Sequence, residues 1–204
     1  VNSYEVKSGN KAYTAQTADY ILSADGNKLV AVSPFTSGEF TEASIGNTKV
    51  TVIGKGAFSH NRKITSVDLP SVVTVGDYGL ASNDFLVSVK LGNLKEIGEY
   101  GFFESGITEL PSINAETSIG RYAFSHTQLT SVSIPDNAVI AEGTYSECQS
   151  LSEIVIGDND TLGAIVAAHT QADMLVILTA VDKVSLNFNK PDQKNLAKLT
   201  LEEA

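Results

Sequence analysis

Apolar residues recur along the middle of this chain in a fixed order, with a period of about 22 residues. Each copy opens on an aliphatic residue, and a glycine or alanine, a small residue, a large apolar residue and a small polar residue or cysteine follow in turn. The second half of each copy alternates apolar with polar residues, as in Val67-Asp68-Leu69. This alternation predicts one short β-strand per copy, with a single buried face. The aliphatic residues that open the five copies are Ile53, Val75, Ile97, Ile119 and Ile140.

One copy is too short to bury its own apolar face, so the copies must stack on one another to share a continuous core. In such a stack the strands lie side by side in a parallel ladder, about 4.8 Å apart. The glycine column suits a turn with unusual backbone angles or a close approach of two backbones. The small polar column suits a turn in which a side chain binds exposed backbone groups of the neighbouring coil. Length differences between copies fall just after this column, which marks a surface turn. The polar column holds Asn61, Asn83, Ser105, Thr127 and Cys148.

The repeated phrase resembles that of the BspA-like leucine-rich repeats, a family of bacterial surface proteins written roughly I-G-x-x-A-F-x-x-C/N-x-x-L-x-x-I-x-I-P. Residues 119–135 read IGRYAFSHTQLTSVSIP, and the resemblance extends over residues 40–157. It implies an α/β-type leucine-rich repeat solenoid, mostly of short parallel β-strands stacked in rungs. Cys148 falls in the family's Cys/Asn column, so we interpret it as a buried structural thiol. Ser112 breaks the apolar pattern, and Ile113 is expected to take its place.

The whole chain, 1–204, is interpreted as a single leucine-rich repeat domain in three parts. Residues 1–39 are expected to form an N-terminal β-hairpin cap, residues 40–157 hold the repeats, and residues 158–204 hold a degenerate repeat and a C-terminal strand/helix cap. Both ends need a cap because the terminal rungs of a solenoid expose open faces.

The N-terminal cap is expected to contain two hairpins, which turn at Gly9-Asn10 and at Asp25-Gly26. Asp-Gly is a strong hairpin signal because the central residues of such a turn take positive φ. The segment FTEASI, residues 40–45, then supplies the first rung.

At the other end the repeat pattern decays. Residues 162–172 have a helix-like pattern, and strands are expected at 174–179 and 184–188. The second of these strands is expected to seal the last rung.

The composition narrows the classes of partner. The net charge is −10 and no stripe of Lys or Arg is present, which argues against nucleic acid and anionic membranes as partners. No apolar run reaches the length of a transmembrane helix, so no membrane insertion is expected in this fragment. Cys148 is the single cysteine and excludes an internal disulfide. The chain starts at Val1 rather than Met, so we expect that a signal or anchor segment is absent from it.

The sequence offers little catalytic chemistry, and we expect no enzyme, no cofactor and no metal site. His60 and His126 share a column three rungs apart, roughly 15 Å by strand spacing, which is too far to share a metal ion. The glycines belong to the repeat or to hairpins, and no serine has a plausible His and Asp partner. Glu109 and Glu153 share a column two rungs apart, about 10 Å by strand spacing. An inverting glycosidase needs about 6.5–9.5 Å between its carboxyl groups, so a carbohydrate-active enzyme stays as the less favoured alternative.

A recognition role is the favoured hypothesis, with an extracellular or cell-surface location. The resemblance implies adhesion, and the partner would be an unknown protein or glycan, for instance of the host extracellular matrix. A structural spacer or stalk is the alternative, because a binding module needs exposed aromatic anchors and most aromatic residues fall in core columns. The expected binding face consists of the outward residues of the strands: Ser66, Asp68, Ser88, Lys90, Glu109, Ser131, Ser133 and Glu153.

Overall fold

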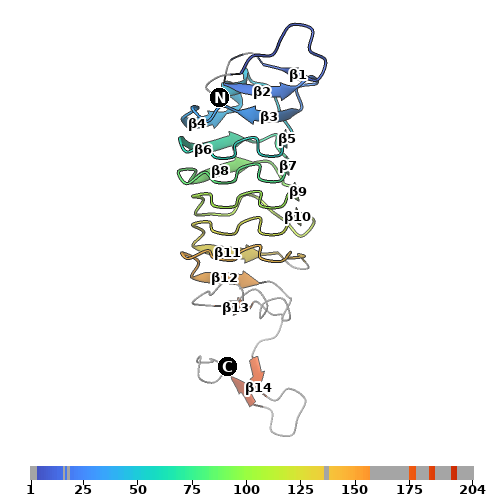
Figure 1. Ribbon diagram of the computed structural model, residues 1–204. Helices are drawn as coiled ribbons and strands as arrows, with labels where there is room; N and C mark the ends of the chain where they lie inside the picture. The colour runs from blue at the N-terminus through green and yellow to red at the C-terminus, as the bar shows by residue number, and fades with distance from the viewer. Residues whose placement is uncertain are drawn as a thin grey trace.

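The computed structural model describes residues 4–156 except 16, 18, 136 and 137, together with the backbone of three later strands at 175–177, 184–186 and 194–196. Within this part, the chain winds into a stack of coils, each lying on the one before it (Figure 1). The repeat columns therefore become the long edges of the stack, and equivalent residues of successive copies are neighbours. The stacked coils predicted from the 22-residue period are confirmed.

Two ladders of parallel strands run along two sides of the stack (Figure 1). The first ladder contains the aliphatic residues that open the first four of the five copies. Its strands are β5 (Val52–Ile53), β7 (Thr74–Val75), β9 (Glu96–Ile97) and β10 (Ser118–Ile119). Ile140, which opens the fifth copy, lies outside a strand. Ile53 pairs with Val75, and Val75 pairs with Ile97. The sequence predicted one strand per copy. It missed this ladder because two residues are too few to show a period.

The second ladder is the predicted one, and it is split in two. One part contains β4 (Gly38–Thr41), β6 (Ile64–Leu69) and β8 (Ser88–Leu91), and the other contains β11 (Ser131–Ile134), β12 (Glu153–Ile156) and β13 (Leu175–Ile177). Val67 pairs with Val89, and Val132 pairs with Ile154, so the inward positions follow the predicted register.

The apolar columns meet between the two ladders and form one core. Its large side chains stack along the axis: the ring centroids of Phe102 and Phe124 lie 5.1 Å apart, and those of Phe124 and Tyr145 lie 5.7 Å apart. All three side chains are buried, and each of the two phenylalanines contributes about 1.5–3 kcal/mol through removal of apolar surface from water. Leu110 and Ile113 pack against this core, so Ile113 takes the place that Ser112 leaves, as expected.

The segment after the first ladder forms the outer arm, which we define as residues 54–62 and their equivalents in the other copies. Backbone hydrogen bonds join the arms of successive coils: Gly56 N donates to Asp77 O at 2.9 Å, and Phe58 N donates to Gly79 O at 2.9 Å. The glycine column lets these backbones approach one another. A Cβ added at Gly120, for example, would lie 2.6 Å from Glu99 N.

The N-terminal cap contains the predicted hairpin of β2 (Tyr20–Ser23) and β3 (Lys28–Val32), which are antiparallel. Gly26 has φ 72° and donates its N–H to Ser23 O at 2.9 Å. Asp25 has no positive φ, contrary to the prediction, because the loop is a turn that ends on one left-handed glycine. The Ser23 hydroxyl and the Asn27 amide N–H both donate to the Asp25 carboxylate, which lowers its pKa.

Two other parts of the cap differ from the prediction. β1 (Tyr13–Thr14) pairs with β2 rather than with the segment before Gly9, so the described residues contain no hairpin at Gly9-Asn10. In the segment 40–45, β4 ends at Thr41, and a 3-10 helix (Glu42–Ile45) follows. The rung is therefore shorter than expected.

At the C-terminal end, β13 pairs in parallel with β12 and continues the second ladder by one rung, within the strand expected at 174–179. β14 (Val184–Leu186) pairs with β15 (Lys194–Leu196) in a separate antiparallel sheet. The strand expected at 184–188 thus forms in part, but β13 is the strand that covers β12. The helix expected at 162–172 lies outside the described residues.

Candidate binding surfaces

The predicted binding face lies on the outer side of the second ladder. Its members fall into two groups, because the ladder itself is split: Ser66, Asp68, Ser88 and Lys90 on β6 and β8, and Ser131, Ser133 and Glu153 on β11 and β12. Ser66 and Asp68 are half-buried, and the others are exposed. Asp68 stands opposite Lys90 in the register, a favourable neighbour pair of opposite charge.

Glu109, the eighth predicted member, is exposed but lies outside a strand. The described residues 106–117 form no strand. Pro111 has no N–H to donate to a ladder. The sheet is therefore interrupted between β8 and β11. The separation of about 10 Å inferred for Glu109 and Glu153 assumed a continuous ladder, which the structure does not have.

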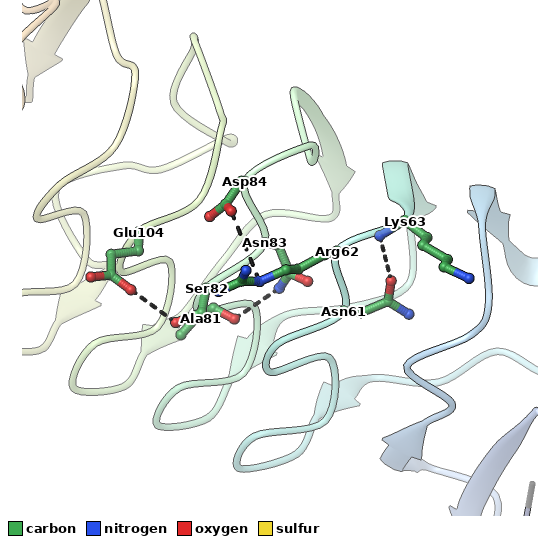
Figure 2. A network of polar contacts seen from close by, with 8 residues as sticks. All are labelled: Asn61, Arg62, Lys63, Ala81, Ser82, Asn83, Asp84 and Glu104. Carbon is green, nitrogen blue, oxygen red and sulfur yellow. Dashed lines mark hydrogen bonds and ion pairs between the residues drawn. The ribbon is translucent and has the colours of Figure 1, made fainter. Parts of the chain in front are cut away.

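A network of polar contacts holds the corner between the outer arm and the second ladder (Figure 2). Asn61 Oδ1 accepts a hydrogen bond from Lys63 N at 3.0 Å, and Asn83 Nδ2 donates to Ala81 O at 3.0 Å. Both asparagines are buried. The predicted bonds to a neighbouring coil form at Asn61, whose Nδ2 donates to Ser33 O at 2.8 Å. At Asn83 the side chain binds backbone groups of its own coil instead. The exposed ion pair between Arg62 Nε and Asp84 Oδ2, which lie 4.0 Å apart, adds little stability at the surface.

Exposed apolar side chains stand on the same corner, between this polar network and the strand face. Phe85 is 59% exposed, Val87 is 52% exposed, and Phe35 is 52% exposed. Lys63 occupies the position in its coil that Phe85 occupies in the next coil. The Nζ atom of Lys63 lies 5.2 Å from the centre of the Phe35 ring. We call Phe35, Lys63, Phe85 and Val87 the Phe85 patch. Val87 directly precedes β8, so the patch adjoins the predicted binding face.

A second row of aromatic side chains runs along the outer arm. Tyr78 stacks on Tyr100 with ring centroids 4.9 Å apart and planes at 7°, and Tyr100 stacks on Tyr122 at 5.2 Å and 11°. We call these three residues the tyrosine ladder. They occupy one column of the repeat, in which Gly56 precedes them and Gly143 follows them. The three tyrosines at the repeat spacing are visible in the sequence, but their stacking was not predicted.

The tyrosines of the ladder have left-handed backbone angles, with φ between 53° and 57° in each case: 54° at Tyr78, 56° at Tyr100 and 55° at Tyr122. This conformation costs a non-glycine residue about 1–2 kcal/mol. Each stacked pair returns about 0.5–1.5 kcal/mol beyond the burial of its area. The three strained residues cost about 3–6 kcal/mol together and the two stacked pairs return about 1–3 kcal/mol, so the stacking offsets part of the backbone strain that the ladder requires.

The remaining candidates for chemistry are isolated. His60 and His126 lie on exposed turns of the outer arm, and in the described part of the chain no group of three or more His, Cys, Asp or Glu could hold a metal ion. Cys148 is buried, with its Sγ 3.2 Å from Thr127 Oγ1, and burial raises the pKa of its thiol. The structural thiol predicted at this position is confirmed.

Comparison with known families agrees with this geometry. The family model described as BspA type leucine-rich repeat region matches six copies over residues 31–152, more than half of the chain. The chain belongs to the BspA-type leucine-rich repeat family. Such repeats are typical of bacterial surface proteins. Within the described residues of this BspA-type chain, no helix is long and apolar enough to cross a membrane.

The second half of the chain also matches another family. The amino acid kinase family model matches residues 121–204 and overlaps the last repeats. Among curated proteins, 46 residues are 54% identical to the carbamate kinase of Oenococcus oeni and 54% identical to that of Clostridium perfringens. Each match covers 22% of this chain and 15% of the kinase. The chain thus spans about 15% of the length of these relatives, and no solved structure matches it.

Proposed function

We propose that this BspA-type chain is a non-enzymatic recognition module that binds a protein partner through the second ladder and the Phe85 patch. The observation that carries the proposal is the exposure of Phe85 and Val87 beside the polar strand face. Binding energy at protein interfaces concentrates in a few aromatic or apolar anchors surrounded by polar residues. No such anchors were predicted from the sequence. The structure therefore supports a binding module over a plain spacer.

The charge of the face indicates what kind of partner fits it. The predicted binding face carries three carboxylates, Asp68, Glu109 and Glu153, and one cation, Lys90. The whole chain has a net charge of −10. An acidic, serine-rich surface is complementary to a basic or hydroxyl-rich partner. Binding should therefore weaken as added salt screens the exposed charges.

Membership of the family supports a location outside the cell, and we propose surface adhesion as the biological role. A protein of the host extracellular matrix is the first class of partner to test, and a matrix glycan is the second. A structural stalk remains the alternative, and it predicts that the repeats bind neither class.

The experiment measures binding of the purified chain to a panel of extracellular-matrix proteins and glycans, at low and high salt. For a partner so found, Phe85→Ser and Val87→Thr should each weaken binding by about tenfold or more, the size expected for the loss of an anchor. Val139→Thr is the matched control, because Val139 is 80% exposed away from the patch. It should leave binding unchanged.

A second variant tests the charges of the face. Changing Glu109, Ser131 and Glu153 together to Lys should leave the fold intact, because surface substitutions usually change stability little. It should abolish binding to a basic partner. Full binding by this variant and by Phe85→Ser would place the interface elsewhere on the stack, and no binding by the natural chain would favour the stalk.

We also propose that the 204 residues have no kinase activity of their own. The match covers 15% of the length of carbamate kinases, while phosphoryl transfer needs groups that position both substrates and a metal ion. Carbamate-dependent turnover of ATP by the purified chain would contradict this proposal. Cleavage of a glycan that is lost on Glu109→Gln would instead revive the carbohydrate-active alternative.

A further inference from the structure

The tyrosine ladder has one covered end and one open end. At the covered end, the ring of Tyr122 lies over Gly143, where an added Cβ would collide with it. Each ring thus rests on the coil that follows it: Tyr78 on Tyr100, Tyr100 on Tyr122, and Tyr122 on Gly143. The open end is the other face of Tyr78, which is 40% exposed.

Gly56 leaves the place beside that open face empty. It occupies the ladder position in the preceding coil, and the backbones of the two coils are joined by the bond from Gly56 N to Asp77 O. Apart from the chain neighbours Lys55 and Ala57, the atom nearest to a Cβ added at Gly56 would be Ser59 Cβ at 3.9 Å, so no atom of Tyr78 comes near. The ladder position next to Tyr78 therefore holds no ring from this chain, at the spacing of one coil.

A polar pair lies at the edge of this position. Lys55 Nζ is 3.3 Å from Asp77 Oδ2, and the side chains are 74% and 42% exposed. Glu99 N donates to Asp77 Oδ1 at 3.1 Å, which fixes the orientation of the carboxylate. The pair offers hydrogen-bond donors and an acceptor on one side of an aromatic ring, and its net charge is zero.

We propose that Tyr78, Gly56, Lys55 and Asp77 form a subsite for a single neutral sugar ring of a glycan. The C–H face of a pyranose carries partial positive charge and suits the negative face of an aromatic ring. Hydroxyl groups at the edge of the sugar can accept from Lys55 and donate to Asp77. The Asp77 carboxylate repels a phosphate or an acidic sugar, and the Lys55 ammonium repels a cation. An aromatic side chain would form no hydrogen bond with either group. The subsite lies on the outer arm and is independent of the protein-binding face proposed above.

The test uses saturation-transfer NMR of the full chain with methyl β-galactoside and methyl β-glucoside as probes. The sugar signals should show transfer, and Tyr78→Ala should lower affinity by about tenfold or more, as for other rings that stack on an aromatic side chain. Tyr13→Ala is the control for unspecific stacking, because Tyr13 is 46% exposed outside the ladder. It should leave the transfer unchanged.

A filling variant separates loss of the site from loss of the fold. Gly56 has φ 62°, close to that of the three tyrosines, so Gly56→Tyr should extend the ladder by one ring and cover Tyr78. This variant should keep a cooperative thermal unfolding transition and should bind no sugar. It should still bind any protein partner of the strand face, whereas Phe85→Ser should keep sugar binding. Three results would overturn the proposal. They are sugar binding by a folded Gly56→Tyr variant, no saturation transfer from the natural chain to either sugar, and equal transfer to p-cresol as a tyrosine analogue.

Discussion

At the scale of single residues, this fold depends on columns rather than on isolated contacts. A large apolar residue at one position of the repeat lies on its equivalents in the coils before and after it, as Phe124 lies between Phe102 and Tyr145. The small polar column beneath the turns works in the same way: Cys148 Sγ bonds Phe124 O at 3.1 Å and contacts Thr127. A substitution in such a column removes contacts from three coils at once.

Phe124→Ala should therefore destabilise the protein by about 3–5 kcal/mol, because the surrounding coils cannot close the cavity. Thermal unfolding followed by circular dichroism measures the effect. Phe85→Ala is the matched control, since it makes the same change at a side chain that is 59% exposed. The control should change stability by no more than about 0.5 kcal/mol. Equal melting temperatures for the two variants would contradict the buried column.

At the scale of elements, the N-terminal hairpin is joined to the repeats mainly through β3, which pairs in parallel with β5. Leu29 pairs with Ile53 in that register, so the first coil stacks on β3 as later coils stack on each other. The hairpin itself turns on Gly26, the left-handed residue of its loop. The cap can thus be weakened at its turn without direct damage to the repeats.

Gly26→Val should destabilise the cap, since a β-branched residue is strained at φ 72°. Space is not the cause, because a Cβ there would lie 3.6 Å from Thr48 Cγ2, an ordinary contact. Hydrogen exchange should show lost protection across residues 19–33 and retained protection near Val132. Gly9→Val is the control, because Gly9 has φ 83° but lies outside the paired strands. Uniform loss of protection through the stack would show that the cap and the repeats unfold as one unit.

At the scale of the whole molecule, an open stack of strands must protect its ends. The N-terminal hairpin covers one end (Figure 1), and β13 covers the exposed edge of β12 with Ile154 opposite Leu175. This covering strand lies beyond residue 152, where the repeat match ends, and inside the match to the amino acid kinase family. Whatever its origin, the segment supplies backbone partners that the last repeat needs. An uncovered strand edge is a template for association with other chains.

Replacing both Leu175 and Val176 by Pro should expose that edge. Successive residues of a strand point their N–H groups to opposite sides, so the pair removes the donor toward β12 whichever residue carries it. The variant should show a molar mass that rises with concentration in light scattering, while the natural chain keeps a lower mass. The same double change to Ala keeps both N–H groups and serves as the control. An unchanged mass for the Pro variant would mean that β13 is dispensable as a cover.

The sequence by itself determined the stack, because a period of about 22 residues leaves apolar faces that only neighbouring copies can bury. It also determined the inward columns, the burial of Cys148 and the hairpin that turns at Gly26. The single-domain division of residues 1–204 stays a prediction. Tertiary structure alone decided the rest. The second ladder is split at the coil that carries Pro111. Two-residue strands such as β5 form only because a neighbouring coil pairs with them. Whether a tyrosine of the outer arm is stacked or open depends on the residue one coil away, and for Tyr78 that residue is Gly56. Such relations join positions 22 residues apart, which local patterns of apolar and polar residues do not encode.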